Sequence, residues 1–289
     1  DWILGVGDTT SVLGASLSAA HHRVRFGHIE AGLRTTNRMS PFPEEFNRRI
    51  TTVLADLHFA PTLRAQENLR RENIAAHSIV VTGNPIIDTL QYFTNRPEPD
   101  SLKYLWKNLH LDLNKNGKAP RLLLVTFHRR ENIGGPVKEI CAALRDLALS
   151  NNGTLKILGI LHPNPAVHEP ARRDLRDIPN IVLSPPLDYP TMIAVLKRSY
   201  LVLTDSGGLQ EEAPWLKVPL LILRNSTERP EGVNAGVARL TGTSRKRIIL
   251  ETQKILDQPS IHRAMSKGFK GYGDGHASDR IITAIQSHR

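Results

Sequence analysis

Cysteine is almost absent from this sequence, and aromatic residues are scarce. Cys141 is the only cysteine among the 289 residues, so no disulfide can form within the chain. This usage is typical of a reducing compartment, and we expect a cytoplasmic protein. Aromatic residues make up 5% of the chain, which leaves few rings for stacking on bases. No apolar run approaches the roughly 20 residues that a membrane helix needs, so we expect no membrane partner.

Negative charge is in deficit. Lys and Arg number 38 against 28 Asp and Glu, which gives a formal net charge of +10. Clustered cations would favour a nucleic-acid partner, but here they are scattered, and no zinc-ligand or basic-zipper pattern accompanies them. We therefore expect no nucleic-acid partner. A basic surface that serves small anionic ligands such as nucleotides explains the charge at least as well.

Short apolar runs alternate with longer helix-like stretches, which predicts βα units that build parallel sheets. The length allows two domains, and the domain crossover is expected between breaks at residues 83–85 and 95–100. The expected strands are 2–6, 24–29, 57–60, 78–81, 122–125, 154–160, 181–183, 200–203 and 220–223. The expected helices are 10–21, 43–54, 63–72, 134–148 and 191–197, and residues 114–118 are expected to form a polar loop.

Three carboxylates collect near strand ends in the first half of the chain. Asp8 follows the first expected strand, Glu30 ends the second, and Glu44 opens a helix. Ligands of parallel sheets lie outside the carboxyl ends of the strands, and grouped carboxylates suit proton abstraction and return, because repulsion and burial raise some of their pKa values. Plainer interpretations stay open: Asp8 as a helix N-cap and Glu44 as a first-turn acid.

Basic side chains follow a strand of the second half. His128, Arg129 and Arg130 come after strand 122–125, and the acidic Glu131 follows them. There an imidazole and two guanidinium groups can bind anionic oxygens or complete an acid/base set. The alternative is a solvated charge cluster that opens a helix. His162 ends another strand, and the prolines beside it could simply shape a turn.

The segment 203–212 runs from a strand through a Ser-Gly-Gly turn into a helix. Glycines let backbone N–H groups approach an anion, and a helix N-terminus favours a phosphate. The pattern is neither the dinucleotide fingerprint nor a Walker loop, and a plain loop is the alternative. Glu212, turned away from the phosphate, could accept ribose hydroxyls, and Arg229 could place positive charge opposite a diphosphate.

Together these motifs resemble the non-hydrolysing bacterial UDP-N-acetylglucosamine 2-epimerases over almost the whole chain. The shared motifs lie at residues 7–9, 28–34, 40–48, 81–85, 128–132, 205–214, 227–231 and 272–275. The resemblance implies a glycosyltransferase-B-type α/β fold, with two Rossmann-like doubly wound domains facing each other across a cleft. It places the first domain at 1–94, the UDP-binding domain at 95–264, and a C-terminal helix at 265–289 that returns to the first domain.

The resemblance also implies a reaction. The C2 proton of UDP-N-acetylglucosamine is removed, UDP is eliminated, and both are added back to give UDP-N-acetylmannosamine, with no nicotinamide or metal needed. This supplies surface-polysaccharide precursors. The matching catalytic residues are Asp8, Glu30, Glu44 and His128. The matching UDP contacts are Ser206, Gly207, Gly208, Glu212 and Arg229. Arg129, Glu131 and His162 match a site for a second UDP-N-acetylglucosamine that acts as an activator, and the family suggests a homodimer.

One part of the family pattern has no counterpart here. The family's first strand, with a glycine-containing loop and an Arg and a Lys that contact substrate, is missing, so we expect an incomplete first domain and a natural chain that begins earlier. Three other enzymes stay open: a hydrolysing relative that releases UDP and free N-acetylmannosamine, an epimerase for a modified UDP-sugar, and a UDP-sugar glycosyltransferase. A fragment that binds UDP without catalysis is the alternative from another class.

Overall fold

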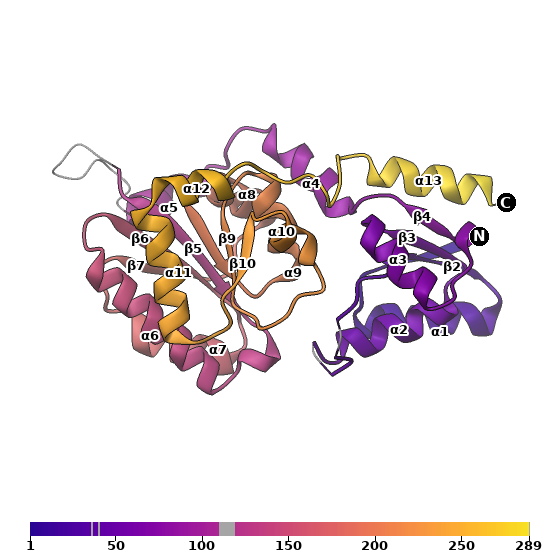
Figure 1. Cartoon of the computed structure of the whole chain (residues 1–289), viewed down its shortest axis with the longest axis horizontal. Coiled ribbons are helices and arrows are strands. Elements are labelled where there is room, and N and C mark those ends of the chain that lie inside the picture. The colour runs from indigo at the N-terminus through magenta and orange to yellow at the C-terminus, as the bar shows by residue number, and fades with distance from the viewer. Residues whose placement is uncertain (36, 40, 110–118, 289) are drawn as a thin grey trace. The chain divides into compact units, whose positions relative to one another are not determined.

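The computed structural model describes residues 1–35, 37–39, 41–109 and 119–288, and the chain divides into two compact units (Figure 1). Unit 1 comprises Asp1–Gln91 and Lys270–Arg289, and unit 2 comprises Tyr92–Phe269. The domain boundaries expected after residues 94 and 264 stay predictions. The polar loop expected at 114–118 lies outside the described residues.

Unit 1 is built on a parallel sheet whose strands follow one another in chain order, β1-β2-β3-β4. These are β1 (Trp2–Val6), β2 (Arg25–Ile29), β3 (Leu57–Ala60) and β4 (Ile79–Val81). The helices of this unit are α1 (Thr10–His22), α2 (Glu44–Leu54), α3 (Leu63–Arg71) and α13 (Ala277–Ser287), with a short 3-10 turn at Ala76–Ser78. Val6 pairs with Ile29 in the β1–β2 register, so the residues after both strands emerge side by side.

Side chains alternate between the two faces of this sheet. Phe26 packs with Val12 of α1 on one face, whereas Phe59 packs with Ile281 of α13 on the other. The C-terminal helix therefore completes the core of unit 1, although it is far away in the sequence from the strands that it covers (Figure 1).

Unit 2 holds a larger parallel sheet of order β10-β9-β8-β5-β6-β7. Its strands are β5 (Arg121–Phe127), β6 (Leu155–Leu161), β7 (Ile181–Ser184), β8 (Leu201–Thr204), β9 (Leu220–Ile222) and β10 (Ala238–Leu240). The chain adds β6 and β7 on one side of β5, then crosses back to add β8, β9 and β10 on the other. The strand order therefore reverses between β5 and β8, and such a reversal opens a ligand crevice at the carboxyl ends of the two strands.

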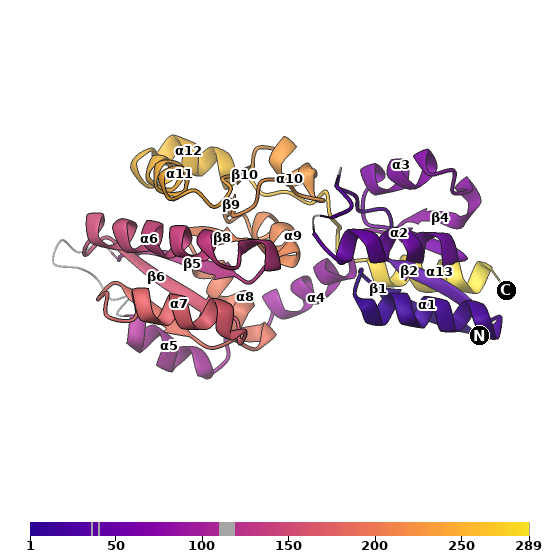
Figure 2. The same ribbon diagram turned by 90° about the horizontal axis from the view of Figure 1, so that it is seen from below.

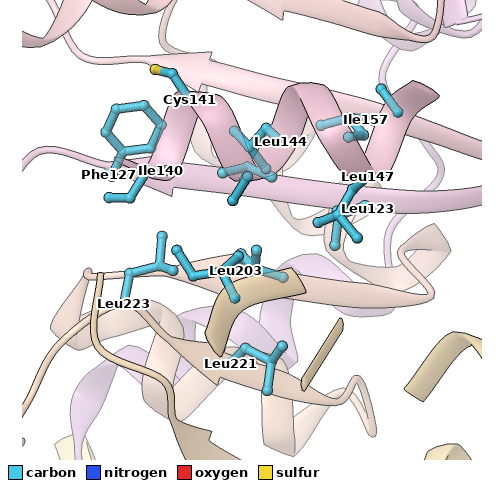
Figure 3. Close-up of a cluster of buried hydrophobic side chains, with 14 of the residues drawn as sticks. Leu123, Phe127, Ile140, Cys141, Leu144, Leu147, Ile157, Leu203, Leu221 and Leu223 are labelled. Atoms are coloured by element: carbon cyan, nitrogen blue, oxygen red, sulfur yellow. The ribbon is translucent and has the colours of Figure 1, made fainter. Parts of the chain in front are cut away.

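Helices cover both faces of the sheet of unit 2 (Figure 2). One face carries α6 (Gly135–Ser150), α7 (Pro165–Leu175), α11 (Arg245–Asp257) and α12 (Pro259–Met265). The other carries α5 (Ser101–Leu109), α8 (Tyr189–Arg198) and α9 (Gly207–Trp215). Figure 3 shows the first face, where Leu144 and Leu147 of α6 lie against Leu123 of β5. Truncating a leucine buried in this way costs about 2–5 kcal/mol, so this layer fixes β5 firmly.

All nine expected strands are present, but several helices were not predicted. The break expected at residues 83–85 is wrong in part, because Pro85 is the first residue of α4 (Pro85–Thr94). The prolines near His162 do more than shape a turn, since Asn164 caps α7 and Pro165 opens it. The sequence also did not predict α5, α10 (Pro230–Asn234), α11, α12 and β10. Within the described ranges, no helix has the length and apolar character needed to cross a membrane.

Candidate active site

Asp8 is held by a buried guanidinium at the end of β1. The N-cap of α1 is Thr9, whose side chain accepts a hydrogen bond from the Val12 N–H at 3.3 Å, so the interpretation of Asp8 as the N-cap is wrong. The Asp8 carboxylate instead forms an ion pair with Arg48 of α2. The Arg48 side chain is only 4% exposed and the Asp8 side chain 25%. Asp8 is thus an anchored carboxylate that keeps access to solvent.

Glu30 stands directly after β2 in a backbone conformation that non-glycine residues rarely adopt. Its φ is +65°, in the left-handed region, which costs a residue with a Cβ atom about 1–2 kcal/mol. Asn84 donates to its Oε1 at 2.5 Å. Its Oε2 lies next to Gly7, where an added Cβ would come within 3.2 Å of that oxygen. A half-buried carboxylate is therefore fixed on a strained backbone at the strand end.

Glu44 and Glu45 open α2 and differ in their surroundings. Glu45 is fully buried and accepts from Arg48 at 3.2 Å, from Arg49 at 2.9 Å and from the Thr35 N–H at 3.1 Å. Glu44 is the half-buried first residue of the helix, as the first-turn interpretation expects. Since Arg48 binds both Asp8 and Glu45, it ties the helix that carries Glu44 to the end of β1.

His28 supports the same strand ends from inside unit 1. The ring is fully buried, and its Nε2 lies 2.9 Å from the Gly7 carbonyl, to which it donates. Burial lowers the His28 pKa to about 4, so the imidazole is neutral at neutral pH. This contact fixes the turn that carries Asp8 and borders Glu30. Sequence reasoning did not assign His28 any role.

Asp205 organises the switch point of unit 2. It follows β8 and is fully buried. Its Oδ2 accepts from the backbone N–H groups of His128 and Arg129, both at 2.9 Å, and from Asn132 Nδ2 at 2.8 Å. The hydroxyls of Thr126 and Thr204 meet at 2.6 Å just before, on β5 and β8. The sequence prediction missed this role, although the position of Asp205 between a strand and a Gly-Gly turn was a usable signal.

His128 faces the carboxylate that holds its backbone. Its Nδ1 lies 3.3 Å from Asp205 Oδ1, and its ring stacks on His162 with centroids 5.4 Å apart and planes inclined by 15°. Burial lowers the His128 pKa, Asp205 opposes this, and Arg129 and His162 lower it further. The side chain is thus a neutral imidazole near neutral pH, able to donate from one nitrogen and accept at the other.

A pocket of about 310 Å³ opens at this switch point. Apolar side chains such as Phe127, Leu187 and Met192 line much of it. The lining residues with polar side chains are Thr126, His128, His162, Tyr189, Ser206 and Glu212. An apolar wall with a few converging polar groups is the usual composition of a small-molecule site.

The first turn of α9 borders this pocket. Ser206 occupies the N-cap position and Gly207 begins the helix, so the first backbone N–H groups have no partner within the helix. A Cβ atom at Gly207 would lie 2.7 Å from Arg229 Nη1, so only glycine lets this guanidinium approach the turn. Arg229 in turn pairs with Glu211 and, at 2.6 Å, with Glu228. Its charge is therefore largely balanced by two buried carboxylates.

Glu212 points toward a tyrosine that the sequence did not single out. Tyr189 Oη donates to Glu212 Oε1 at 2.6 Å, and Glu212 is only 4% exposed. Burial raises the Glu212 pKa, whereas the hydrogen bond from Tyr189 lowers it. Burial and the neighbouring Glu212 charge raise the pKa of Tyr189, so its hydroxyl remains a donor. In the wall of the pocket, the half-buried Tyr189 thus donates to the buried Glu212.

The three residues of the expected effector site contact different partners in unit 2. His162 stacks on His128. Arg129 Nε lies 3.4 Å from the Asp205 carbonyl, and Glu131 lies 3.7 Å from the buried Arg224. In the described ranges, no group of three or more His, Cys, Asp or Glu side chains is arranged to hold a metal ion.

The sequence is similar to a family of known enzymes over nearly its whole length. A family model described as UDP-N-acetylglucosamine 2-epimerase matches residues 1–286. The UDP-N-acetylglucosamine 2-epimerase of Salmonella typhimurium is 43% identical over 290 aligned positions, which cover 100% of this chain and 76% of that protein. The chain belongs to the UDP-N-acetylglucosamine 2-epimerase family.

Solved structures of this epimerase family have the same fold as this chain. The UDP-GlcNAc 2-epimerase from Neisseria meningitidis bound to UDP-GlcNAc matches with a TM-score of 0.92 and 38% identity, over 99% of this chain and 76% of that one. The structure of S. aureus MnaA with UDP matches with a TM-score of 0.90 and 40% identity, over 100% of this chain and 76% of that one. The expected fold class is confirmed: the chain is an α/β protein with parallel sheets, like its glycosyltransferase-B-type relatives. The expectation of an isomerase family is confirmed as well.

Proposed function

We propose that this chain catalyses the reversible inversion of C2 of UDP-N-acetylglucosamine, which gives UDP-N-acetylmannosamine. Membership of the UDP-N-acetylglucosamine 2-epimerase family supports the proposal, as does a relative bound to UDP-GlcNAc. The observation that carries it is the Glu30 carboxylate, fixed at a strand end by Asn84 in a strained left-handed conformation. Such strain persists where a function requires the side chain at that place.

The proposed chemistry proceeds by elimination and addition. A carboxylate takes the proton from C2 while the bond between C1 and the UDP oxygen breaks, and its electron pair leaves with UDP. A double bond between C1 and C2 remains. The UDP oxygen then attacks C1, and an acid returns a proton to C2 from the opposite face. In this scheme Asp8, Glu30 and Glu44 handle the protons, because a weakly acidic C–H bond needs an anionic base shielded from water.

Unit 2 would hold the leaving group. The Ser206 N–H donates to Thr204 Oγ1 at 3.0 Å, so at the first turn of α9 the N–H groups of Gly207 and Gly208 and the Ser206 hydroxyl would bind the diphosphate. Glu212, kept as an acceptor by Tyr189, would take the ribose hydroxyls. The Arg229 guanidinium, which lies next to Gly207, would contact the phosphates even though Glu211 and Glu228 balance much of its charge. The neutral His128 would donate to the phosphates or to the sugar.

The remaining assignments belong to the same proposal. Arg129, Glu131 and His162 would bind a second UDP-N-acetylglucosamine as an activator. The chain would work as a homodimer, and an apolar surface on α1 and α2 supports this, where Val53 is 80%, Phe46 47% and Leu17 42% exposed. Sedimentation of the purified chain tests the dimer. We place the protein in the cytoplasm, where it would supply precursors of surface polysaccharides.

Product analysis tests the proposed reaction. The purified chain is incubated with UDP-N-acetylglucosamine, and the sugar products are separated and identified by NMR. UDP-N-acetylmannosamine as the product supports the proposal. Free N-acetylmannosamine with UDP assigns the hydrolysing reaction instead. An unchanged substrate, with UDP still bound in a titration, contradicts the proposed activity and leaves a nucleotide-binding protein.

A further inference from the structure

A buried asparagine that no catalytic assignment includes touches the proposed base. Asn84 lies in the three-residue connection between β4 and α4 and is 2% exposed. Its Nδ2 donates to Glu30 Oε1 at 2.5 Å, across 54 residues of sequence. Because β4 and β2 are separated by β3 in the sheet, only the folded strand ends bring the two residues together.

The orientation of the Asn84 amide is set by a second contact. Its Oδ1 accepts from the Ile86 N–H at 3.1 Å, at the beginning of α4. A flipped amide would place its NH2 group against that N–H and its oxygen against the Glu30 carboxylate, so both contacts would become repulsive. The donor of Asn84 must therefore face Glu30.

The Asn84 backbone is fixed as well. Its N–H donates to the carbonyl of Tyr272 at 2.7 Å, and Tyr272 is 1% exposed. Gly83 packs against the same segment, since an added Cβ would lie 3.1 Å from Gly273 Cα. The chain that returns to unit 1 before α13 thus holds Asn84 rigidly, and a rigid donor can hold a side chain that stands on a strained backbone.

We infer that Asn84 is a positioning residue for proton transfer at C2 and acts through Glu30. The Asn84 amide engages Oε1, and Gly7 leaves room for Oε2, so the carboxylate has one defined orientation at the end of β2. The contact with Ile86 alone would explain a helix cap. It does not explain why the other half of the amide meets the proposed base. This inference rests on the proposed function.

Asn84→Asp separates the two contacts of this side chain. An aspartate keeps an oxygen for the Ile86 N–H, since Asp and Asn cap helices about equally well, but it places an oxygen where Glu30 now finds a donor. We expect kcat for epimerisation to fall roughly 10- to 100-fold, as for a catalytic group displaced by about 1 Å. KM for UDP-N-acetylglucosamine and Kd for UDP should change less than about twofold, because an interaction specific to the transition state moves kcat first.

Asn180→Asp is the matched control in unit 2. Asn180 is also buried, and its Nδ2 donates to the Ala148 carbonyl at 3.2 Å and to Asn152 at 2.9 Å. The same chemical change there should lower the melting temperature and leave kcat at the wild-type value. A drop in kcat for this control equal to that of Asn84→Asp would make the effect one of general instability and would overturn the inference.

The decisive measurement repeats Asn84→Asp in a Glu30→Gln background. If Asn84 acts through Glu30, the second substitution adds no further loss of kcat. Equal fold-losses in both backgrounds, or an unchanged kcat for Asn84→Asp in the wild-type background, overturn this inference alone. A wild-type chain without epimerase turnover, or a Glu30→Gln variant as fast as the wild type, overturns the proposed role of Glu30, and the inference falls with it.

Discussion

The two units hold their candidate charges in opposite ways. In unit 2 the central carboxylate, Asp205, is fully buried and saturated by donors from His128, Arg129 and Asn132. In unit 1 the carboxylates of Asp8 and Glu30 are partly exposed, and each contacts one buried partner. Asp8 forms an ion pair with Arg48, and Glu30 accepts a hydrogen bond from Asn84. The Asp205 carboxylate is thus enclosed by the fold, whereas the carboxylates of Asp8 and Glu30 keep access to solvent.

This difference indicates a division of tasks. The Asp205 network shapes the switch point, where the pocket and the first turn of α9 lie, and its role is structural. Unit 1 instead contains features that lower its stability, because Glu30 adopts a strained conformation and His28 is buried and neutral beside Gly7. Substitutions should therefore affect chemistry in unit 1, and stability or nucleotide affinity in unit 2.

Glu30→Gln should give the largest effect. Removing the proposed base should lower turnover about 10³-fold, within the 10²- to 10⁴-fold range of general base catalysis, because the amide cannot accept the C2 proton. UDP affinity should stay unchanged. Initial rates and UDP titrations measure both quantities. Glu67→Gln on α3, where an exposed pair with Arg71 is lost, serves as the control. Equal activity of the two variants would exclude Glu30 as the base.

Asp205→Ala should give the largest loss of stability. Three donors, one of them buried and two partly buried, would lose their acceptor, at a cost of about 3 kcal/mol or more in the free energy of unfolding. Asp205→Asn keeps an acceptor oxygen and should cost less. Urea unfolding of both variants measures this order. Two variants within about 0.5 kcal/mol of the wild type, the range of ordinary surface substitutions, would show that the network is dispensable.

Acidification should weaken unit 1 through His28. The folded state lowers the pKa of this group from 6.5 to about 4, so the unfolded chain binds the proton first as the pH falls. The contribution of neutral His28 to the free energy of unfolding is complete above about pH 6.5 and is lost toward pH 4. At pH 5 the free energy of unfolding should be about 2 kcal/mol lower for this reason. His58, whose pKa is also lowered by burial, adds in the same direction.

Hydrogen exchange in β1 and β2 at pH 7.5 and pH 5 measures this loss locally. His28→Gln, which cannot be protonated, should reduce the difference between the two pH values. Protection that is independent of pH in the wild type, or a difference that persists fully in His28→Gln, would contradict the role of His28.

Tyr189→Phe should give the smallest effect. Glu212 would lose one hydrogen bond, worth about 1 kcal/mol, so Kd for UDP should rise about fivefold. Calorimetric titration measures the affinity. The control is Tyr104→Phe on α5, where the ring is 74% exposed and no change is expected. An unchanged Kd for Tyr189→Phe would separate Glu212 from ribose binding.

The sequence predicted the sheets better than the helices around them. Strands 2–6 and 57–60 were predicted with their observed bounds, because buried parallel strands are short apolar runs between turn residues. Pro85 and Pro165 were interpreted as breaks or turns, yet both open helices, since proline is well tolerated in the first turn. The basic start of α11, at Arg245, gave no apolar signal that could have marked a helix.

Local motifs in the sequence indicated some structural features of the candidate site, whereas contacts between distant residues were missed. The Ser-Gly-Gly turn indicated the first turn of α9 directly. The contacts of Asn84 with Glu30 and of Tyr189 with Glu212 depend on strand order and helix packing, which a single sequence does not encode position by position. For Arg229 the sequence suggested a positive charge near a diphosphate. It did not predict the two buried carboxylates that pair with this side chain in the folded chain.

Deuterium exchange at C2 tests the central claim most directly. The chain is incubated with UDP-N-acetylglucosamine in D2O, and the C2 proton of both sugar isomers is followed by NMR. Proton removal by a carboxylate at one face and return at the other predicts that every molecule of the manno product carries deuterium at C2. A manno product that keeps its original C2 proton would contradict the account, because inversion would then proceed without exchange with solvent.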